Sequence, residues 1–223
     1  MSVLHNSTPV LKNRANLRPT ERPGRRERRR TETRTKILHA ALQLFARKGF
    51  FATTTEQITE AADVGQGTFF NYFPSKQHVF GVLAEIQMQK VRRAREQAES
   101  SEMNVRAVLE RLTHDIAREP GRSPALTRAL FSAFLSSETV RMLFAGTLAK
   151  GREDLAVIML LGQRRGEILK ACNADDLARS FQRGVVGTLL LWAIDPKRSL
   201  KTALNNAFLD FWAGASARKG SFE

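Results

Sequence analysis

Residues 63–76 read DVGQGTFFNYFPSK, and their residue types suit two quite different kinds of site. Two glycines around a glutamine could open a loop whose backbone amides cradle a phosphate, as in nucleotide-binding enzymes. The same residues could instead form a short helix with a polar face that touches a partner. The choice between these interpretations separates an enzyme from a binding protein.

The phosphate-loop interpretation fails on spacing. A dinucleotide-binding loop follows a strand and needs a third glycine at position 70, where the chain has Phe70. The preceding segment instead predicts a helix that starts at Thr54, because Gln57 three residues later completes a capping box. A P-loop would end in Gly-Lys-Ser or Gly-Lys-Thr, which this stretch lacks. The sequence therefore favours a short helix over about 66–73.

The two faces of that short helix differ sharply in chemistry. At about 100° per residue, Phe69 and Phe73 point inward as core residues. The opposite face is small and polar and has an aromatic residue on each flank: Gly67, Thr68 and Asn71, with Phe70 and Tyr72 beside them. A low-relief face of this kind can enter the major groove of DNA, where asparagine pairs with adenine and a threonine methyl touches thymine.

Residues around this helix extend the predicted DNA contact. Gln66, at the helix start, is placed to reach base edges first. Tyr72 and Lys76 suit phosphates at the rim, as do Thr53 and Thr54 at the start of the preceding helix. The alternative for these polar side chains is an ordinary solvated surface.

The elements that must position these residues are helices throughout. Apolar residues at helical spacing predict a first helix that ends before Gly49, Gly65 is a tolerable N-cap, and Pro74 stops the short helix. Ser75 caps a long helix to about residue 98. The remaining apolar patterns predict helices at about 103–119, 124–136, 138–148, 151–168, 174–194 and 200–215. No alternating strand pattern occurs, so the predicted fold class is all-α.

Charge divides the chain unevenly. The net charge is +14, and residues 1–36 hold eleven basic and three acidic residues, a net +8. We expect 1–30 to be a disordered basic arm that touches the minor groove or phosphates, although a solvated tail without a role is the alternative. Residues 31–80 would form a three-helix DNA-binding domain with a helix-turn-helix motif at about 54–73. Residues 81–218 would form a larger helical regulatory and dimerisation domain.

The sequence offers little for other chemistry. Cys172 is the one cysteine, and the four histidines lack metal-ligand spacing, so we expect no disulfide, no metal, no cofactor and no catalytic residues. No apolar signal region follows Met1, and the apolar run 185–194 is about half a membrane span. We expect a soluble cytoplasmic protein that does not enter a membrane.

Residues 33–80 resemble the DNA-binding domain of the TetR/AcrR family of transcriptional regulators. The resemblance rests on the ILxAALxLFxxxGF helix, the threonines before Ile58, AxxV through the turn, GT at 67–68 and YFPSK at 72–76. It implies a homodimeric regulator, usually a repressor, that binds a palindromic operator and is released by a small molecule. The family's DNA-contacting positions fall on Thr53, Thr54, Gln66, Gly67, Thr68, Phe70, Asn71, Tyr72 and Lys76.

Three positions depart from the family pattern. Phe70 stands where tyrosine is common, so a hydroxyl contact to phosphate is missing. Asp63 replaces a common turn glycine, and aspartate tolerates the left-handed conformation better than most residues. Gly65 replaces a common capping serine, which weakens that cap.

The last two predicted helices are unusually apolar and rich in aromatic residues. They suit either a buried core or a four-helix interface between two subunits, and we expect the interface. The interface residues would be Phe181, Val185, Thr188, Trp192, Leu204, Phe208 and Phe211. An effector pocket is weakly indicated by His114, Phe131 and Phe134, for which a place in the core is the alternative.

Two other classes of protein compete with a transcriptional regulator. The first is a helical ligand-binding protein or enzyme with incidental affinity for nucleic acid. The sequence contains no group of residues that supports it. A protein that lies on membrane surfaces would use residues 1–36, but that segment lacks an apolar face.

Overall fold

The computed structural model describes residues 24–100 and 103–217, and over these residues it is helical, without a strand. The elements are α1 (Arg25–Lys48), α2 (Thr55–Ala61), α3 (Gln66–Tyr72), α4 (Gln77–Ser100), α5 (Val105–Ala117), the 3-10 helix η1 (Pro120–Arg122), α6 (Pro124–Ser136), α7 (Glu138–Arg164), α8 (Ala174–Ile194) and α9 (Leu200–Ala215). The predicted all-α fold class is confirmed.

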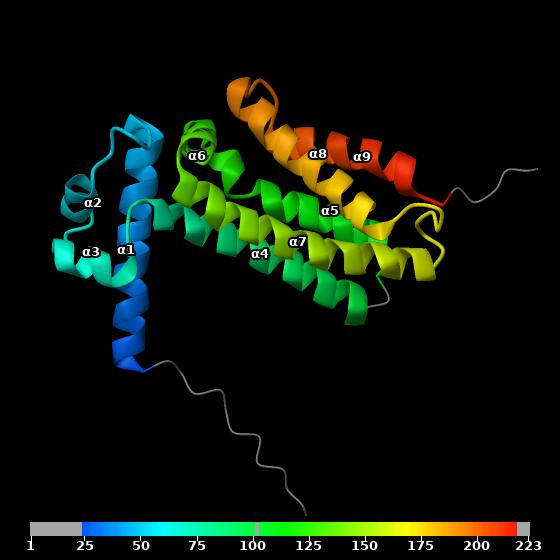
Figure 1. The fold of residues 1–223 in the computed structure, drawn as a ribbon, viewed down its shortest axis with the longest axis horizontal. Coiled ribbons are helices and arrows are strands. Elements are labelled where there is room, and N and C mark those ends of the chain that lie inside the picture. The colour runs from blue at the N-terminus through cyan, green and yellow to red at the C-terminus, as the bar shows by residue number, and fades with distance from the viewer. Residues whose placement is uncertain (1–23, 101–102, 218–223) are drawn as a thin grey trace, which may run out of the picture.

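The helices form a small unit and a long body (Figure 1). Helices α1, α2 and α3 gather at one end, and α4 leads from them into the body alongside α7. Helices α8 and α9 form a hairpin that packs on α5 and α7. Helix α4 therefore connects the small unit mechanically to the interior of the body.

Aromatic packing holds the small unit together. Phe45 on α1 packs on Phe80 of α4 and on Phe50, with ring centroids 4.9 and 5.3 Å apart. Phe69 and Phe73 are 0% and 1% exposed in the same cluster, which confirms their predicted core role. Residues of α6 and α7 complete this cluster, so the body packs directly against the small unit.

Helix α1 begins earlier than the sequence pattern indicated. The expected disordered arm, 1–30, is wrong for its last six residues, because α1 starts at Arg25. Arginine and glutamate are good helix formers, and Glu27 in the first turn complements the helix dipole, so these residues extend the amphipathic helix that follows. Residues 1–23 of the expected arm lie outside the described residues.

Helix α7 is longer than predicted, because the expected break at Gly151 does not occur. Gly151 is buried within the helix, and a Cβ atom there would lie 3.6 Å from the Met88 sulfur on α4. That distance is an ordinary van der Waals contact, and the helix continues through glycine at a cost of about 0.5–1 kcal/mol relative to alanine. An ion pair of 2.9 Å between Arg95 and Asp154 joins the same two helices.

Most of the expected dimer-interface residues belong instead to the core of the single chain. Phe181, Trp192, Leu204 and Phe208 are at most 7% exposed, and the Trp192 Nε1 donates to the Arg198 carbonyl at 2.8 Å. Their assignment to an interface was wrong, since the apolar stripes of α8 and α9 pack on each other and on α5. The remaining three residues are half-buried: Val185, Thr188 and Phe211.

No helix in residues 24–100 or 103–217 is long and apolar enough to span a bilayer.

Candidate nucleic-acid interface

The turn between α2 and α3 has the geometry that its sequence predicts. The Thr54 hydroxyl accepts from the Gln57 amide at 3.3 Å, and the Gln57 side chain accepts from the Thr54 amide at 3.4 Å. Asp63 adopts a left-handed φ of 51°, as expected of the residue in this turn position. Gly65 is the N-cap of α3 and gives no side-chain hydrogen bond. Helix α3 is thus set at a fixed angle to α2.

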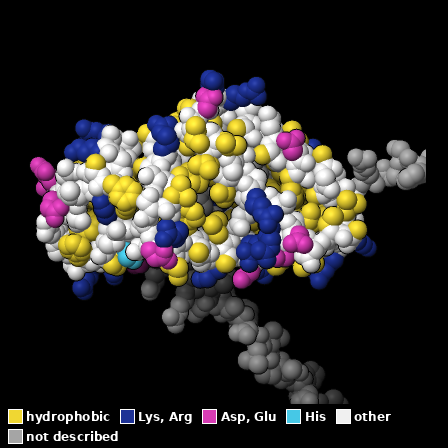
Figure 2. Space-filling model, turned by 45° about the horizontal axis from the view of Figure 1, so that its top comes forward, with side chains coloured by type: hydrophobic (Ala, Val, Ile, Leu, Met, Phe, Trp, Pro, Cys, Tyr) yellow, Lys and Arg dark blue, Asp and Glu magenta, His cyan; other side chains and the backbone are white. Residues whose placement is uncertain are grey.

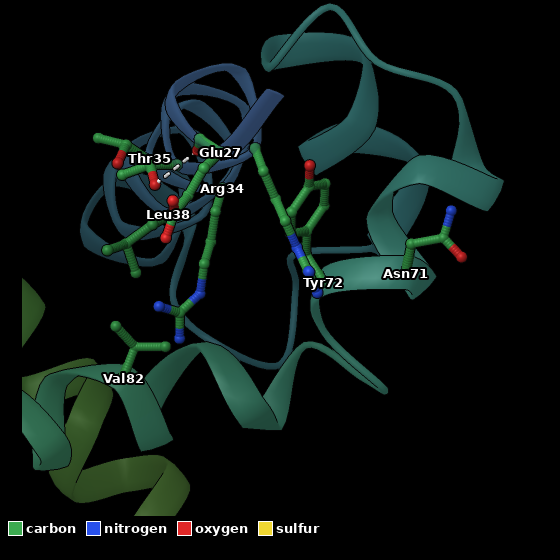
Figure 3. A pocket seen from close by; sticks show the side chains of 9 residues that line it. Glu27, Arg34, Thr35, Leu38, Asn71, Tyr72 and Val82 are labelled. Carbon is green, nitrogen blue, oxygen red and sulfur yellow. Dashed lines mark hydrogen bonds between the residues drawn. The ribbon is translucent and has the colours of Figure 1, made fainter. Parts of the chain in front are cut away.

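Helix α3 presents the small polar face that the helical wheel predicts. Gly67 and Asn71 are exposed, and a Cβ atom at Gly67 would meet nothing within 4 Å. Thr68 is half-buried beside them, and the Phe70 ring on the flank is 52% exposed. Figure 3 shows the Asn71 side chain pointing away from α1, on the open side of α3. This face of α3 is therefore open to a partner.

Gln66 is held in place by the preceding helix. Its side-chain amide donates to the Glu56 carboxylate at 3.3 Å. Hydrogen bonds from its own backbone and from the Thr54 side chain lower the pKa of Glu56, so the carboxylate keeps its charge. With the amide nitrogen engaged, the Gln66 carbonyl oxygen remains as an acceptor for the amino group of adenine or cytosine.

Lys76 has a different role from the predicted phosphate contact. Its ammonium donates to the backbone carbonyls of Thr53, Phe50 and Phe51, at 2.7, 3.0 and 3.4 Å. It also lies 4.7 Å from the centroid of the Phe50 ring. Burial lowers the pKa of Lys76, and the carbonyl oxygens offset that loss of hydration. With three acceptors, all three of its N–H groups are used, so the phosphate role of Lys76 is corrected to a structural one.

We expect Lys76→Met to destabilise the protein by about 1–3 kcal/mol. The substitution keeps the apolar stem but removes three charge-assisted hydrogen bonds, whose value is reduced by partial exposure. Urea unfolding followed by circular dichroism measures the change. Lys48→Met is the matched control, because Lys48 is exposed at the end of α1. Equal stability of the two variants would contradict the structural role of Lys76.

Thr53 was also expected to contact phosphate, and its side chain cannot do so. The residue is 0% exposed, and its hydroxyl donates to the Gly49 carbonyl at 2.8 Å. Thr54 remains exposed, and its hydroxyl oxygen accepts in the cap while its hydrogen bonds to the Glu56 carboxylate. Of the two threonines, only Thr54 has a side chain that a partner can reach.

The structure adds two residues to the interface that the sequence pattern missed. Arg30 and Arg34 on α1 line a pocket of about 440 Å³ with Asn71 and Tyr72 of α3. Tyr72 is half-buried, and it points toward α1 in Figure 3. Arg30 was assigned to a disordered arm, and Arg34 was not singled out within the predicted domain at 31–80. The signal that could have found them is their helical spacing ahead of Ile37.

The three residues of the expected effector pocket do not line any of the three pockets described in the structure. Phe134 packs against the core of the DNA-binding unit, with its ring 6.0 Å from that of Phe144. His114 and Phe131 are half-buried on α5 and α6. Among the described residues no cluster of three or more histidine, cysteine, aspartate or glutamate side chains could hold a metal.

Comparison with known proteins identifies the small unit. Residues 37–83 match the family described as "Bacterial regulatory proteins, tetR family". The chain is 46% identical over 57 residues to the HTH-type transcriptional regulator TcmR of Streptomyces glaucescens, covering 26% of this chain and 25% of that protein. It is 32% identical over 108 residues to the HTH-type transcriptional repressor KstR of Rhodococcus jostii, covering 48% and 51%. The matches thus span a quarter to a half of these relatives.

Solved structures share the fold over most of the chain. The fatty acid degradation regulator FadR from Bacillus halodurans aligns with a TM-score of 0.70 at 20% identity, covering 82% of this chain and 95% of that one. FadR from Bacillus subtilis, solved in complex with stearoyl-CoA, aligns with a TM-score of 0.69 at 20% identity, covering 81% and 98%. Residues 37–83 thus match the TetR family of bacterial regulatory proteins, and the helical body shares its fold with these solved structures.

Proposed function

We propose that the protein is a sequence-specific DNA-binding transcriptional regulator, a repressor that binds a palindromic operator as a homodimer. The observation that carries this proposal is the face of α3, where exposed Asn71 and Gly67 form a small polar surface next to the capped helix α2. Among the described residues, Gly67 and Asn71 are left exposed on that face. Its residue types match the donors, acceptors and methyl groups in the major groove.

Each residue of the interface has a proposed role. Asn71 and the Gln66 carbonyl read base edges, while Gly67 lets the helix approach closely and Thr68 and Phe70 make apolar contact with thymine methyl groups. Tyr72 donates its hydroxyl to a phosphate, and exposed Thr54 lies beside a phosphate at the start of α2. Because Phe70 has no hydroxyl and its ring is 52% exposed, an apolar contact replaces the phosphate contact expected of a tyrosine.

The outer face of the α8–α9 hairpin supports a dimer, although through different residues from those expected. Leu191 and Ile194 are 69% and 66% exposed, and Leu209 on α9 is 42% exposed. Cβ atoms at Gly184 and Gly187 would meet nothing within 4 Å, so a second helix can approach closely there. Figure 2 shows hydrophobic side chains gathered on the face that carries the C-terminal half of α8. Two copies joined there would form a four-helix interface.

Regulation by a small molecule is proposed to act through α4. Four residues separate the end of α3 from the start of α4, and α4 continues beside α7. A shift of α4 therefore changes the spacing between the α3 helices of the two subunits. The Gln87 side-chain oxygen on α4 is buried and has no hydrogen-bond partner among the described residues, so an effector with a donor group could bind it. The complex of Bacillus subtilis FadR with stearoyl-CoA supports an effector in the helical body.

In this proposal the protein acts by binding DNA and not by catalysis. It would be located in the bacterial cytoplasm, which contains the chromosome. Selection of bound fragments from genomic and random DNA tests the function. We expect an enriched inverted repeat whose half-sites lie about one helical turn apart. Recovery of fragments without any common sequence would overturn the proposal.

A further inference from the structure

Helix α1 extends beyond the core of the DNA-binding unit, and the character of its inner face changes there. Ile37 and Ala41 pack into the core on that face. Continuing toward the N-terminus in steps of three and four residues, the same face carries Arg34, Arg30 and Arg26, all exposed. The core-facing stripe thus turns from apolar to basic at the point where the domain ends.

This basic stripe faces the recognition helix across the pocket described above. Arg30 and Arg34 line one wall, and Tyr72 of α3 and Val82 of α4 line the others (Figure 3). The Arg34 guanidinium lies 5.9 Å from the centroid of the Phe73 ring at the end of α3. Arginine side chains on α1 are therefore directed toward the flank of the helix that would enter the groove.

Positive charge exceeds negative charge on this surface. Residues 25–34 include six arginines and only two acidic residues, Glu27 and Glu32. Glu27 lines the same pocket and opposes the arginines there, but no ion pair in the described residues engages Arg30 or Arg34. An excess of guanidinium groups beside a tyrosine hydroxyl suits phosphate, which arginine binds through two parallel hydrogen bonds.

We propose that the N-terminal extension of α1 is a second DNA-contacting element that holds the phosphate backbone flanking the groove occupied by α3. Arg26, Arg30 and Arg34 form the contact, and the pocket between α1 and Tyr72 receives one phosphate. The ten residues of 25–34 span about 15 Å of helix, enough to follow more than one phosphate along a strand. The inference rests on the proposed function, since it requires α3 to be the groove-entering helix.

Among polyanionic partners, DNA fits this surface better than a membrane. The stripe before Ile37 carries arginines without apolar residues between them, so the helix has no face to insert into lipid. The wall of the pocket opposite the arginines is formed by α3. Only a ligand that also contacts α3 would use both walls of the pocket. Binding of the full-length protein to anionic phosphatidylserine vesicles that depends on Arg30 and Arg34, with DNA binding unchanged, would overturn the proposal.

The test compares two double substitutions that remove equal charge from the same helix. Arg30→Ala with Arg34→Ala removes the stripe that faces α3, whereas Arg25→Ala with Arg29→Ala removes exposed arginines from another side of α1. Affinity for a DNA duplex recovered by the selection is measured between roughly 50 and 200 mM salt. We expect the first pair to reduce the slope of log affinity against log salt by about 1.8 per bound protomer, and the second pair to change it little.

Three further observations separate the outcomes. The Arg30 and Arg34 pair should lower the affinity for a scrambled duplex and for the selected duplex by the same factor, because phosphate contacts carry no sequence information. Glu27→Gln should tighten binding, since it removes the one acidic side chain of the pocket. Equal slopes for both pairs, with sequence-specific binding intact, would overturn this inference and leave the proposed function standing. Absence of any sequence preference in the unaltered protein would instead overturn the proposed function.

Circular dichroism and thermal unfolding exclude a trivial loss of structure. The Arg34 guanidinium lies over the Phe73 ring, and its removal also deletes this cation–π contact, so a lysine variant is needed as well. Arg30→Lys with Arg34→Lys keeps the charge but loses the bidentate geometry. We expect it to retain the salt slope and to bind more weakly than the unaltered protein. A slope as low as that of the alanine pair would contradict an electrostatic contact.

Discussion

Asn71→Ala is expected to abolish recognition of the operator while leaving folding and dimerisation unchanged. An asparagine bound to a base through two hydrogen bonds contributes about 1–3 kcal/mol of discrimination, and a dimer uses it twice. The affinity for the operator should therefore fall roughly 30- to 20,000-fold, by about 2–6 kcal/mol in all. Affinity for unrelated DNA should change little, because the phosphate contacts remain.

The matched control is Gln43→Ala, which removes an exposed amide from the outer side of α1 in the same domain. Fluorescence anisotropy with the selected duplex and a scrambled duplex gives the two affinities. The measured quantity is the ratio of specific to non-specific affinity, which should collapse for Asn71→Ala and stay constant for Gln43→Ala. An Asn71→Ala protein with an unchanged ratio would remove Asn71 from base recognition and weaken the proposal for α3.

The local framework of the site was predictable because short-range rules specify it. The capping box at Thr54 and Gln57 fixes where α2 begins, and Asp63 tolerates the left-handed turn conformation. The four-residue spacing of Phe69 and Phe73 decides which face of α3 is buried. Each of these features depends on neighbours within a few residues, and the sequence contains all of them.

The direction of individual polar side chains was not predictable, because it depends on residues distant in sequence. Lys76 directly precedes α4, a place that suits phosphate, but the carbonyls of the loop at 50–53 take all its donors. Thr53 likewise turns inward to the Gly49 carbonyl. Helical periodicity predicts which face of a helix is exposed, but it does not predict which polar side chains on that face will bond to a nearby loop.

The apolar stripes of α8 and α9 raise the same difficulty on a larger scale. Periodicity identifies Phe181, Leu204 and Phe208 as members of a packed face, but it cannot say whether the packing partner is the same chain or a second copy. In the structure these residues fill the core, and the side chains left outside are Leu191 and Ile194. The candidate interface therefore moves to the opposite side of α8.

Leu191→Arg is expected to convert the protein from a dimer to a monomer. Leu191 is 69% exposed in the single chain, so the substitution leaves the fold intact, as circular dichroism should verify. In a symmetric interface each substitution acts twice: it removes two leucine side chains, worth about 1.5–3 kcal/mol each when fully buried, and places two like charges together. Size-exclusion chromatography with light scattering measures the mass, and the monomer should be about half the size of the unaltered assembly.

Loss of the dimer should also weaken operator binding, because each half-site must then be bound without the second domain held nearby at high effective concentration. Leu160→Arg is the matched control, since Leu160 is an exposed leucine on α7, outside the proposed face. It should remain dimeric and bind the operator normally. Dimers of Leu191→Arg as stable as those of Leu160→Arg would show that copies do not join through the outer face of α8. In that case the exposed leucines would need another partner, and the spacing of the two recognition helices would have to be set by a different surface.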